Sequence, residues 1–114
     1  GYSSAASDVY KRQMPQTVYQ EAKDTGALYL EWKKGNKYLQ YMRTVIHEGE
    51  VVLTDAEYTK KEVDSLCGYE CTYYTKGDEM WIACDDAKYS YQIDATNIEN
   101  PKELLKKMAE DIYK

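Results

Sequence analysis

One histidine, three cysteines and a few acidic pairs are the residues best suited to chemistry in this chain of 114 residues. Cys67 and Cys71 have a C-x3-C spacing, which lacks the C-x2-C step typical of zinc sites, and no second pair follows. A nucleophilic pair of His47 with Cys67 or Cys84 has no supporting motif and no group to orient the base. We therefore expect no catalytic residue, no metal site and no cofactor.

The acidic pairs Asp78-Glu79 and Asp85-Asp86 lie in predicted tight turns, where Asp is favoured for its local backbone hydrogen bonds. The sequence has no Gly-rich phosphate loop, no G-x-S-x-G motif and no EF-hand loop. The net charge of -5 argues against a nucleic-acid partner, because phosphate binding needs a basic face. No apolar run approaches the ~20 residues of a membrane span.

Turn signals place these residues on β-hairpins. The first hairpin joins residues 27–33 to residues 38–46 through Gly35-Asn36, a Gly-first pair suited to a type II′ turn. Its register places Trp32 opposite Leu39, on one half-buried face.

A second hairpin is predicted around Gly77-Asp78, between residues 69–75 and residues 79–85. Its register brings Cys71 opposite Cys84 at a non-hydrogen-bonded pair, where a cross-strand disulfide can be accommodated. Two small buried thiols would fit the same positions. The sequence leaves both alternatives open.

A third hairpin is predicted to turn at Asp86-Ala87 into a strand over residues 88–94. Its predicted pairs are Met80 with Ile93, Ile82 with Tyr91, and Cys84 with Tyr89. The two turns therefore assign one core face of a three-stranded meander. This face consists of Met80, Ile82, Cys84, Tyr89, Tyr91 and Ile93, with Tyr73 alongside. Trp81 points the other way.

The chain closes with a predicted helix that begins at Asn100-Pro101, a cap residue followed by a Pro at the first helical position. Its apolar stripe is Leu104, Leu105, Met108, Ala109 and Ile112. Short strands are expected over residues 17–22 and in the second half of 54–66, where Thr54 and Glu57 offer a competing capping box. The expected fold is α+β, an antiparallel sheet of hairpins and a meander packed against a C-terminal α-helix.

Residues 2–13 read like translated sequencing-adapter DNA, and Gly1 reads like a scar of a cleaved tag. We therefore assign residues 1–13 to an artefactual leader and residues 14–114 to one α+β domain, in which the natural coding region enters near Met14 as a fragment. Val9 and Tyr10 could still add to a sheet edge.

A family resemblance rests on a Gly-containing turn at residues 67–70, a Trp strand at 80–81, a Tyr strand at 89–93 and the helix at 103–112. These segments resemble the domain of unknown function 4367 family. That family forms the extracytoplasmic C-terminal part of many Gram-positive anti-sigma-factor-like and lipoprotein-like proteins. The resemblance implies an outward-facing domain, membrane-tethered or secreted, whose anchor lies in a missing N-terminal part. It brings no catalytic residues.

The leading hypothesis is a noncatalytic extracytoplasmic sensory or binding domain. Its partner would be a protein or a cell-envelope component, bound to a sheet face that carries Trp81, Tyr74 and Tyr29 as exposed rings. One alternative is a small hydrolase or ligand-binding enzyme with a deep pocket lined by His47 and carboxylates. Another is an inhibitor-like or structural module that pairs through an edge strand.

Overall fold

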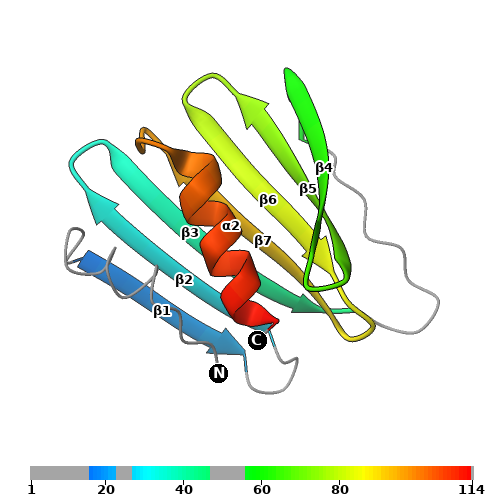
Figure 1. Cartoon of the computed structure of the whole chain (residues 1–114). Helices are drawn as coiled ribbons and strands as arrows, with labels where there is room; N and C mark the ends of the chain where they lie inside the picture. The colour runs from blue at the N-terminus through cyan, green and yellow to red at the C-terminus, as the bar shows by residue number, and fades with distance from the viewer. Residues whose placement is uncertain (1–15, 23–26, 47–55, 114) are drawn as a thin grey trace.

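The computed structural model describes residues 16–22, 27–46 and 56–113 and shows one antiparallel sheet with a helix on one face (Figure 1). The strands follow the order β1-β2-β3-β7-β6-β5-β4. The elements are β1 (Gln16–Ala22), β2 (Ala27–Lys34), β3 (Lys37–Val45), β4 (Lys60–Leu66), β5 (Tyr69–Lys76), β6 (Glu79–Asp85), β7 (Tyr89–Thr96) and α2 (Pro101–Ile112). The α+β prediction is confirmed.

The first hairpin, β2 with β3, has the predicted register. Trp32 pairs with Leu39 and Leu30 with Tyr41, and the turn residue Gly35 has a φ of 58°. A positive φ costs glycine little because it has no Cβ, so the sequence dictates both the place and the kind of this turn. Because side chains alternate along a strand, every second residue of β2 and β3 faces the side of the sheet on which the helix lies.

The second hairpin, β5 with β6, is also confirmed: Tyr73 pairs with Ile82, and Cys71 with Cys84. Its turn residue Gly77 has a φ of 58° as well. The three-stranded meander β5-β6-β7 exists as predicted.

The predicted register of the third hairpin is wrong by two residues. The observed pairs are Met80 with Ala95, Ile82 with Ile93, and Cys84 with Tyr91. The Asp86 side chain explains the shift, because its Oδ1 accepts hydrogen bonds from the N–H groups of Lys88 and Tyr89, both at 2.7 Å. This Asx turn moves the reversal one residue later than expected. Because side chains alternate with a period of two, a shift of two residues leaves each side chain on its predicted face, and the same residues still face the core.

The pairing that joins the two halves of the sheet was not predicted. β3 lies antiparallel to β7, with Leu39 opposite Ala95 and Tyr41 opposite Ile93. It brings the buried face of the first hairpin into line with the buried face of the meander, and a single core results.

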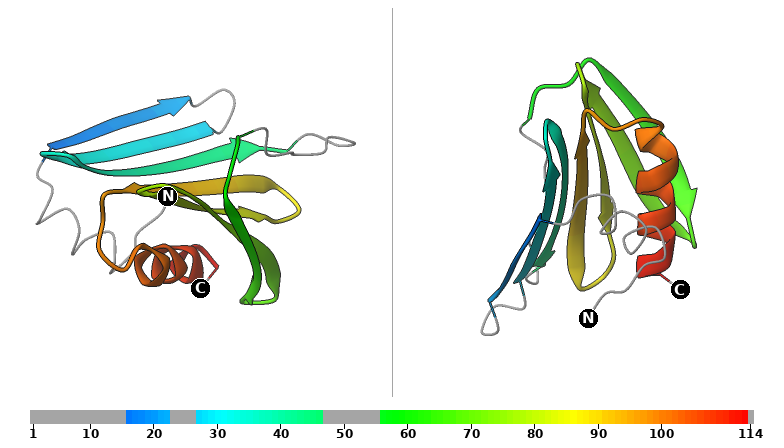
Figure 2. Two further views of the ribbon diagram at one scale, coloured as in Figure 1. Left: turned by 90° about the horizontal axis from the view of Figure 1, so that it is seen from above. Right: turned by 90° about the vertical axis from the view of Figure 1, so that its left-hand side faces the viewer.

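Helix α2 covers this common face. Pro101 occupies its first turn as predicted, but Asn100 makes no side-chain cap and adopts a left-handed φ of 50°. The buried helix residues are Leu105, Met108 and Ala109. The sheet residues buried around them include Leu28, Leu30, Trp32, Leu39, Tyr41, Cys71, Tyr73, Ile82, Cys84, Ile93 and Ala95. The sheet bends so that β4 lies beside α2 (Figure 2).

The two short predicted strands are confirmed as β1 and β4, which form the outer strands of the sheet. The first half of the segment 54–66 lies partly outside the described residues, so the competing capping box at Thr54 is not placed. Val9, Tyr10 and the rest of residues 1–15 also lie outside them.

Candidate binding surface

The predicted binding rings lie on the sheet face opposite α2, but the expected exposure of Trp81 and Tyr74 is wrong. Trp81 is 3% exposed and Tyr74 is 9% exposed. The two rings are cross-strand neighbours that stack nearly parallel, with centroids 5.4 Å apart, and the Tyr58 ring lies 5.0 Å from Tyr74. The outermost ring of the three is therefore Tyr58, at 45% exposure. Stacking along the sheet replaces the projecting aromatic face that we expected.

Tyr29 belongs to a different part of this face, with β3 and β7 between it and Trp81. Its hydroxyl donates to Glu31 Oε2 at 2.7 Å and contacts the Tyr38 hydroxyl at 3.2 Å, while Gln40 Nε2 donates to it. The hydrogen bond from Lys33, then that from Tyr29, lowers the pKa of Glu31. These groups are occupied with one another, so they form a structural network rather than an open site.

Asp94 lies at the centre of the same face, directly opposite Gln40 on β3 and Trp81 on β6. Burial, followed by a hydrogen bond with Glu79, raises the pKa of Asp94 to about 7. Gln92 Nε2 donates to Asp94 Oδ2 at 3.4 Å, and Oδ1 is buried with no hydrogen-bond partner among the described residues. This carboxyl is a source of pH sensitivity in the fold.

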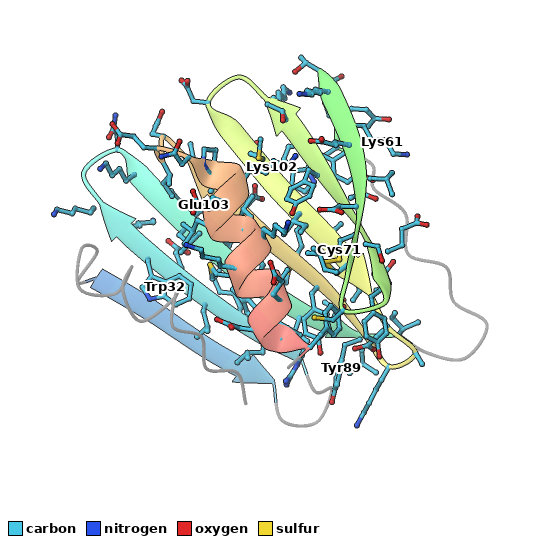
Figure 3. The ribbon with its side chains drawn as sticks, viewed as in Figure 1. Trp32, Lys61, Cys71, Tyr89, Lys102 and Glu103 are labelled. Carbon is cyan, nitrogen blue, oxygen red and sulfur yellow. A yellow bond between two sulfur atoms is a disulfide. The ribbon has the colours of Figure 1, made fainter. Side chains whose placement is uncertain are left out.

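A different aromatic group gathers where α2 ends. Figure 3 shows Tyr89 near the C-terminal end of the helix. The rings that contact one another in this region, which we call the tyrosine cluster, belong to Tyr41, Tyr69, Tyr89, Tyr91 and Tyr113. They come from β3, β5, β7 and the residue that follows α2, so the cluster depends on the whole fold.

The cluster runs from the core to the surface. Tyr91 is buried and packs edge-on against Tyr113, with centroids 5.8 Å apart. Tyr113 in turn stacks on Tyr69 at 4.3 Å, with the planes 22° apart. Tyr69 is 39% exposed, so it presents a ring at the surface that is held in place from below. Burial raises the pKa of both Tyr91 and Tyr113.

Two cations border the cluster at Tyr89. The Arg43 guanidinium lies 4.7 Å from the Tyr89 ring centroid, and Lys88 Nζ lies 5.1 Å from it. Such cation–π contacts stabilise ring orientation and place hydrogen-bond donors at the rim of an apolar surface. The combination of a supported ring, phenol hydroxyls and charged donors suits a ligand with both apolar and hydroxylated faces.

The cysteines lie next to the tyrosine cluster, because Cys84 is the cross-strand partner of Tyr91. Cys71 and Cys84 face each other with their Cα atoms 4.5 Å apart, the spacing of a non-hydrogen-bonded pair, and their sulfur atoms are joined as a disulfide. The predicted juxtaposition is therefore confirmed. Cys67 is an exposed free thiol in the β4–β5 turn, with its Sγ 4.0 Å from the Glu110 carbonyl oxygen.

The family model with the description "Domain of unknown function (DUF4367)" matches residues 10–112. The chain belongs to this family. Comparisons with curated proteins and with solved structures find no match. Within the described residues of this DUF4367 chain, no helix is long and apolar enough to cross a membrane.

The DUF4367 domain also has a hollow of about 340 Å³ at the end of the sheet away from the tyrosine cluster, between the β5–β6 turn and the start of α2. Its lining residues are Thr75, Gly77, Asp78, Glu79, Met80, Asn97, Ile98, Glu99 and Pro101. His47, the expected partner of carboxylates in an enzyme pocket, lies outside the described residues. In the part of the chain that the structure describes, no three potential ligands gather around a metal position.

Three of the five rings were predicted to lie on a buried face: Tyr89 and Tyr91 in the meander, and Tyr41 opposite Leu30 in the first hairpin. Tyr69, which begins a strand, and Tyr113, which follows the predicted apolar stripe of the helix, were not predicted. The signal available was the i, i+4 spacing from Ala109 to Tyr113, which extends the stripe by one turn.

Proposed function

We propose that this DUF4367 chain is a noncatalytic extracytoplasmic sensory or binding domain that holds a cell-envelope component against the tyrosine cluster. The observation that carries the proposal is the stack of exposed Tyr69 on Tyr113, supported from below by Tyr91. Rigid, backed aromatic rings are the typical anchors of a binding surface, because they lose little conformational entropy on binding.

The ligand class that best fits this surface is a polymer of sugar rings. A sugar ring has an apolar C–H face that can pack on the Tyr69 ring and hydroxyls that can bond to the phenol groups at its rim. Arg43 and Lys88 add donors beside Tyr89. Tyrosine phenols are protonated at neutral pH, and burial raises the pKa of Tyr91 and Tyr113 further. Protonated phenols are poor bases, and the surface tyrosines Tyr69 and Tyr89 can donate hydrogen bonds to a ligand, which favours binding over catalysis.

Two further features support the compartment and the tether. The Cys71–Cys84 disulfide suits an oxidising environment outside the cytoplasm. The family resemblance implies a membrane anchor or a secretion signal that would precede the domain. A bacterial cell wall would then be the nearest abundant glycan.

The test is co-sedimentation of the purified chain with purified Gram-positive cell-wall sacculi. We expect the wild type to pellet with the sacculi and Tyr69→Ala to bind at least about tenfold more weakly, since a stacked ring contributes more than ~1.4 kcal/mol. The matched control is Tyr58→Ala, which removes a similarly exposed ring from the other face of the sheet. It should bind like the wild type.

Three results would overturn the proposal. Equal losses in the Tyr69 and Tyr58 variants would show a nonspecific aromatic effect. Unchanged binding by Tyr69→Ala would place the surface elsewhere. No pelleting by the wild type, in buffer with or without salt, would exclude the wall glycan as ligand.

A further inference from the structure

Strand β4 ends the sheet, and no described strand pairs with its outer edge (Figure 1). An unpaired edge exposes N–H and C=O groups that can pair with another strand. The inner edge of β4 is fully used, from Lys60 opposite Thr75 to Leu66 opposite Tyr69. The hydrogen-bond pattern of the sheet decides which backbone N–H and C=O groups on the outer edge of β4 remain unpaired.

In an antiparallel sheet, opposed residues alternate between hydrogen-bonded and non-hydrogen-bonded pairs. Cys71 and Cys84, 4.5 Å apart at Cα, form a non-hydrogen-bonded pair between β5 and β6. The backbone groups of Cys71 must therefore point to β4, where they meet Asp64. Alternate residues of β4 point the opposite way, so the outward backbone groups belong to Lys61, Val63 and Ser65.

Local hydrogen bonds shorten this open edge further. The Ser65 N–H donates to Asp64 Oδ1 at 2.8 Å, so it is already satisfied. Thr59 donates its N–H at 2.7 Å and its hydroxyl at 2.9 Å to the Thr75 carbonyl, so it is turned inward. The open edge consists of Lys61 and Val63. Lys61 lies on the outer side of β4 (Figure 3), and Val63 is 55% exposed.

We propose that β4 pairs antiparallel with β4 of a second copy of this chain, about a two-fold axis that passes between the two Glu62 residues. In this register Lys61 of each copy lies opposite Val63 of the other, and each such pair exchanges both of its backbone hydrogen bonds. Lys60 of each copy then lies opposite Asp64 of the other.

Charge selects this register from its neighbours. Pairing that continues one sheet keeps residues of the same face opposite each other. A two-fold axis at Val63 would place Glu62 opposite Asp64, and an axis at Lys61 would place that lysine opposite itself; directly opposed like charges are destabilising. The axis at Glu62 also opposes two identical acids, but each is already bound to Lys102 of its own chain at 2.7 Å.

The same pattern argues for a second copy rather than an unrelated strand. Lysines on an edge strand normally discourage pairing with other chains. Here the edge carries Lys60 at one end and Asp64 at the other, so an antiparallel copy supplies the opposite charge at both ends. Among the residues that the structure describes, Lys60 has no ion pair of its own. The Lys61 stem can cover the exposed Val63 of the other copy.

The first experiment is sedimentation-velocity ultracentrifugation of the wild type and Val63→Pro. We expect the wild type to shift from monomer to dimer mass below about 1 mM, the weak end of specific association. Val63→Pro should stay monomeric, because proline removes an outward N–H while leaving the β4–β5 ladder intact. The matched control Val63→Thr keeps the N–H and should dimerise. A monomeric wild type, or a dimeric Val63→Pro, would overturn the proposal.

The second experiment is charge reversal, which also guards against a variant that fails to fold. Lys60→Asp alone and Asp64→Lys alone each oppose like charges and should be monomeric. Mixing the two variants restores an attractive pair at both ends, so the mixture should reach dimer mass within about tenfold of the wild-type dissociation constant. If the mixture stays monomeric while the wild type dimerises, the register is wrong. Neither experiment involves the tyrosine cluster, so failure here leaves the proposed function untouched.

Discussion

Lys102 Nζ lies 2.7 Å from Glu62 Oε2, and this contact joins the first turn of α2 to the edge strand β4. The same ammonium group stands 5.2 Å from the Tyr73 ring centroid. The hydrogen bond from Lys102, followed by its charge, lowers the pKa of Glu62. Lys102 therefore connects the helix to two strands where the sheet bends around it.

Replacing Lys102 should weaken this connection modestly. Both charged groups are half exposed, so water screens the ion pair and its contribution to stability is small. We expect Lys102→Ala to lower the free energy of unfolding by about 1 kcal/mol, mainly through the lost contact with Tyr73. In urea unfolding, the loss in the Lys102→Ala/Glu62→Ala double variant should be smaller than the sum of the two single losses, which is a favourable coupling. Lys106→Ala, on the solvent-exposed side of the helix, is the control. A coupling of zero between Lys102 and Glu62 would contradict the contact.

The disulfide predicts a specific thiol count. Denatured, unreduced protein purified in air should show one reactive thiol, from Cys67, and reduced protein should show three. The bridge spans a sequence separation of 13, so loss of both cysteines in Cys71→Ala/Cys84→Ala should cost roughly 3 kcal/mol of unfolding free energy. Three free thiols in the unreduced sample would contradict the bridge. Cys67→Ser should leave the unfolding free energy within about 0.5 kcal/mol of wild type.

Local sequence signals predicted much of this fold because glycine turns fix both the position and the register of a hairpin. Gly35 and Gly77 each stand where a positive φ is needed, and the pairs around them are as predicted. The start of the helix at Pro101 was also predicted from the sequence. At the third turn, Asp86-Ala87 held no glycine, and the Asp86 side chain selected a later reversal.

Contacts between segments far apart in the sequence could not be predicted from local turn signals. No turn connects β3 to β7, so their pairing depends on which buried faces match once both hairpins exist. Trp81 stacks on Tyr74, and Tyr58, from outside the meander, lies against Tyr74 in turn. Alternation correctly placed Trp81 on the face away from the helix, but alternation alone does not state what covers a face.

The correction at Trp81 can be tested by stability. Trp81→Ala should lower the free energy of unfolding by ~3 to 5 kcal/mol, because it leaves a cavity beside Tyr74 and Asp94. Tyr58→Ala, at the exposed end of the same stack, should cost about 1 kcal/mol or less. Thermal and urea unfolding of the two variants measures the contrast. Similar small losses would return Trp81 to the exposed face first expected.

The Asp94 carboxyl makes the stability of the fold depend on pH. Its folded-state pKa is raised to about 7, mainly by burial and then by Glu79, whereas an unfolded Asp titrates near 3.9. The folded state therefore holds a proton that the unfolded state has released. The stabilisation from this group is fully present below about pH 4 and is lost as pH rises through about 7.

Asp94→Asn should remove this dependence, since the amide imitates the protonated acid at every pH. Between about pH 4 and 7, the unfolding free energy of the wild type should fall relative to Asp94→Asn by at most about 1.4 kcal/mol per pH unit. Above pH 7 the variant should be the more stable protein, which inverts the usual cost of changing a buried polar residue. Urea unfolding at one-unit pH steps measures both curves, with Asp78→Asn in the exposed β5–β6 turn as the control. Parallel curves for wild type and Asp94→Asn would show that this carboxyl is already ionised in the folded protein at acid pH.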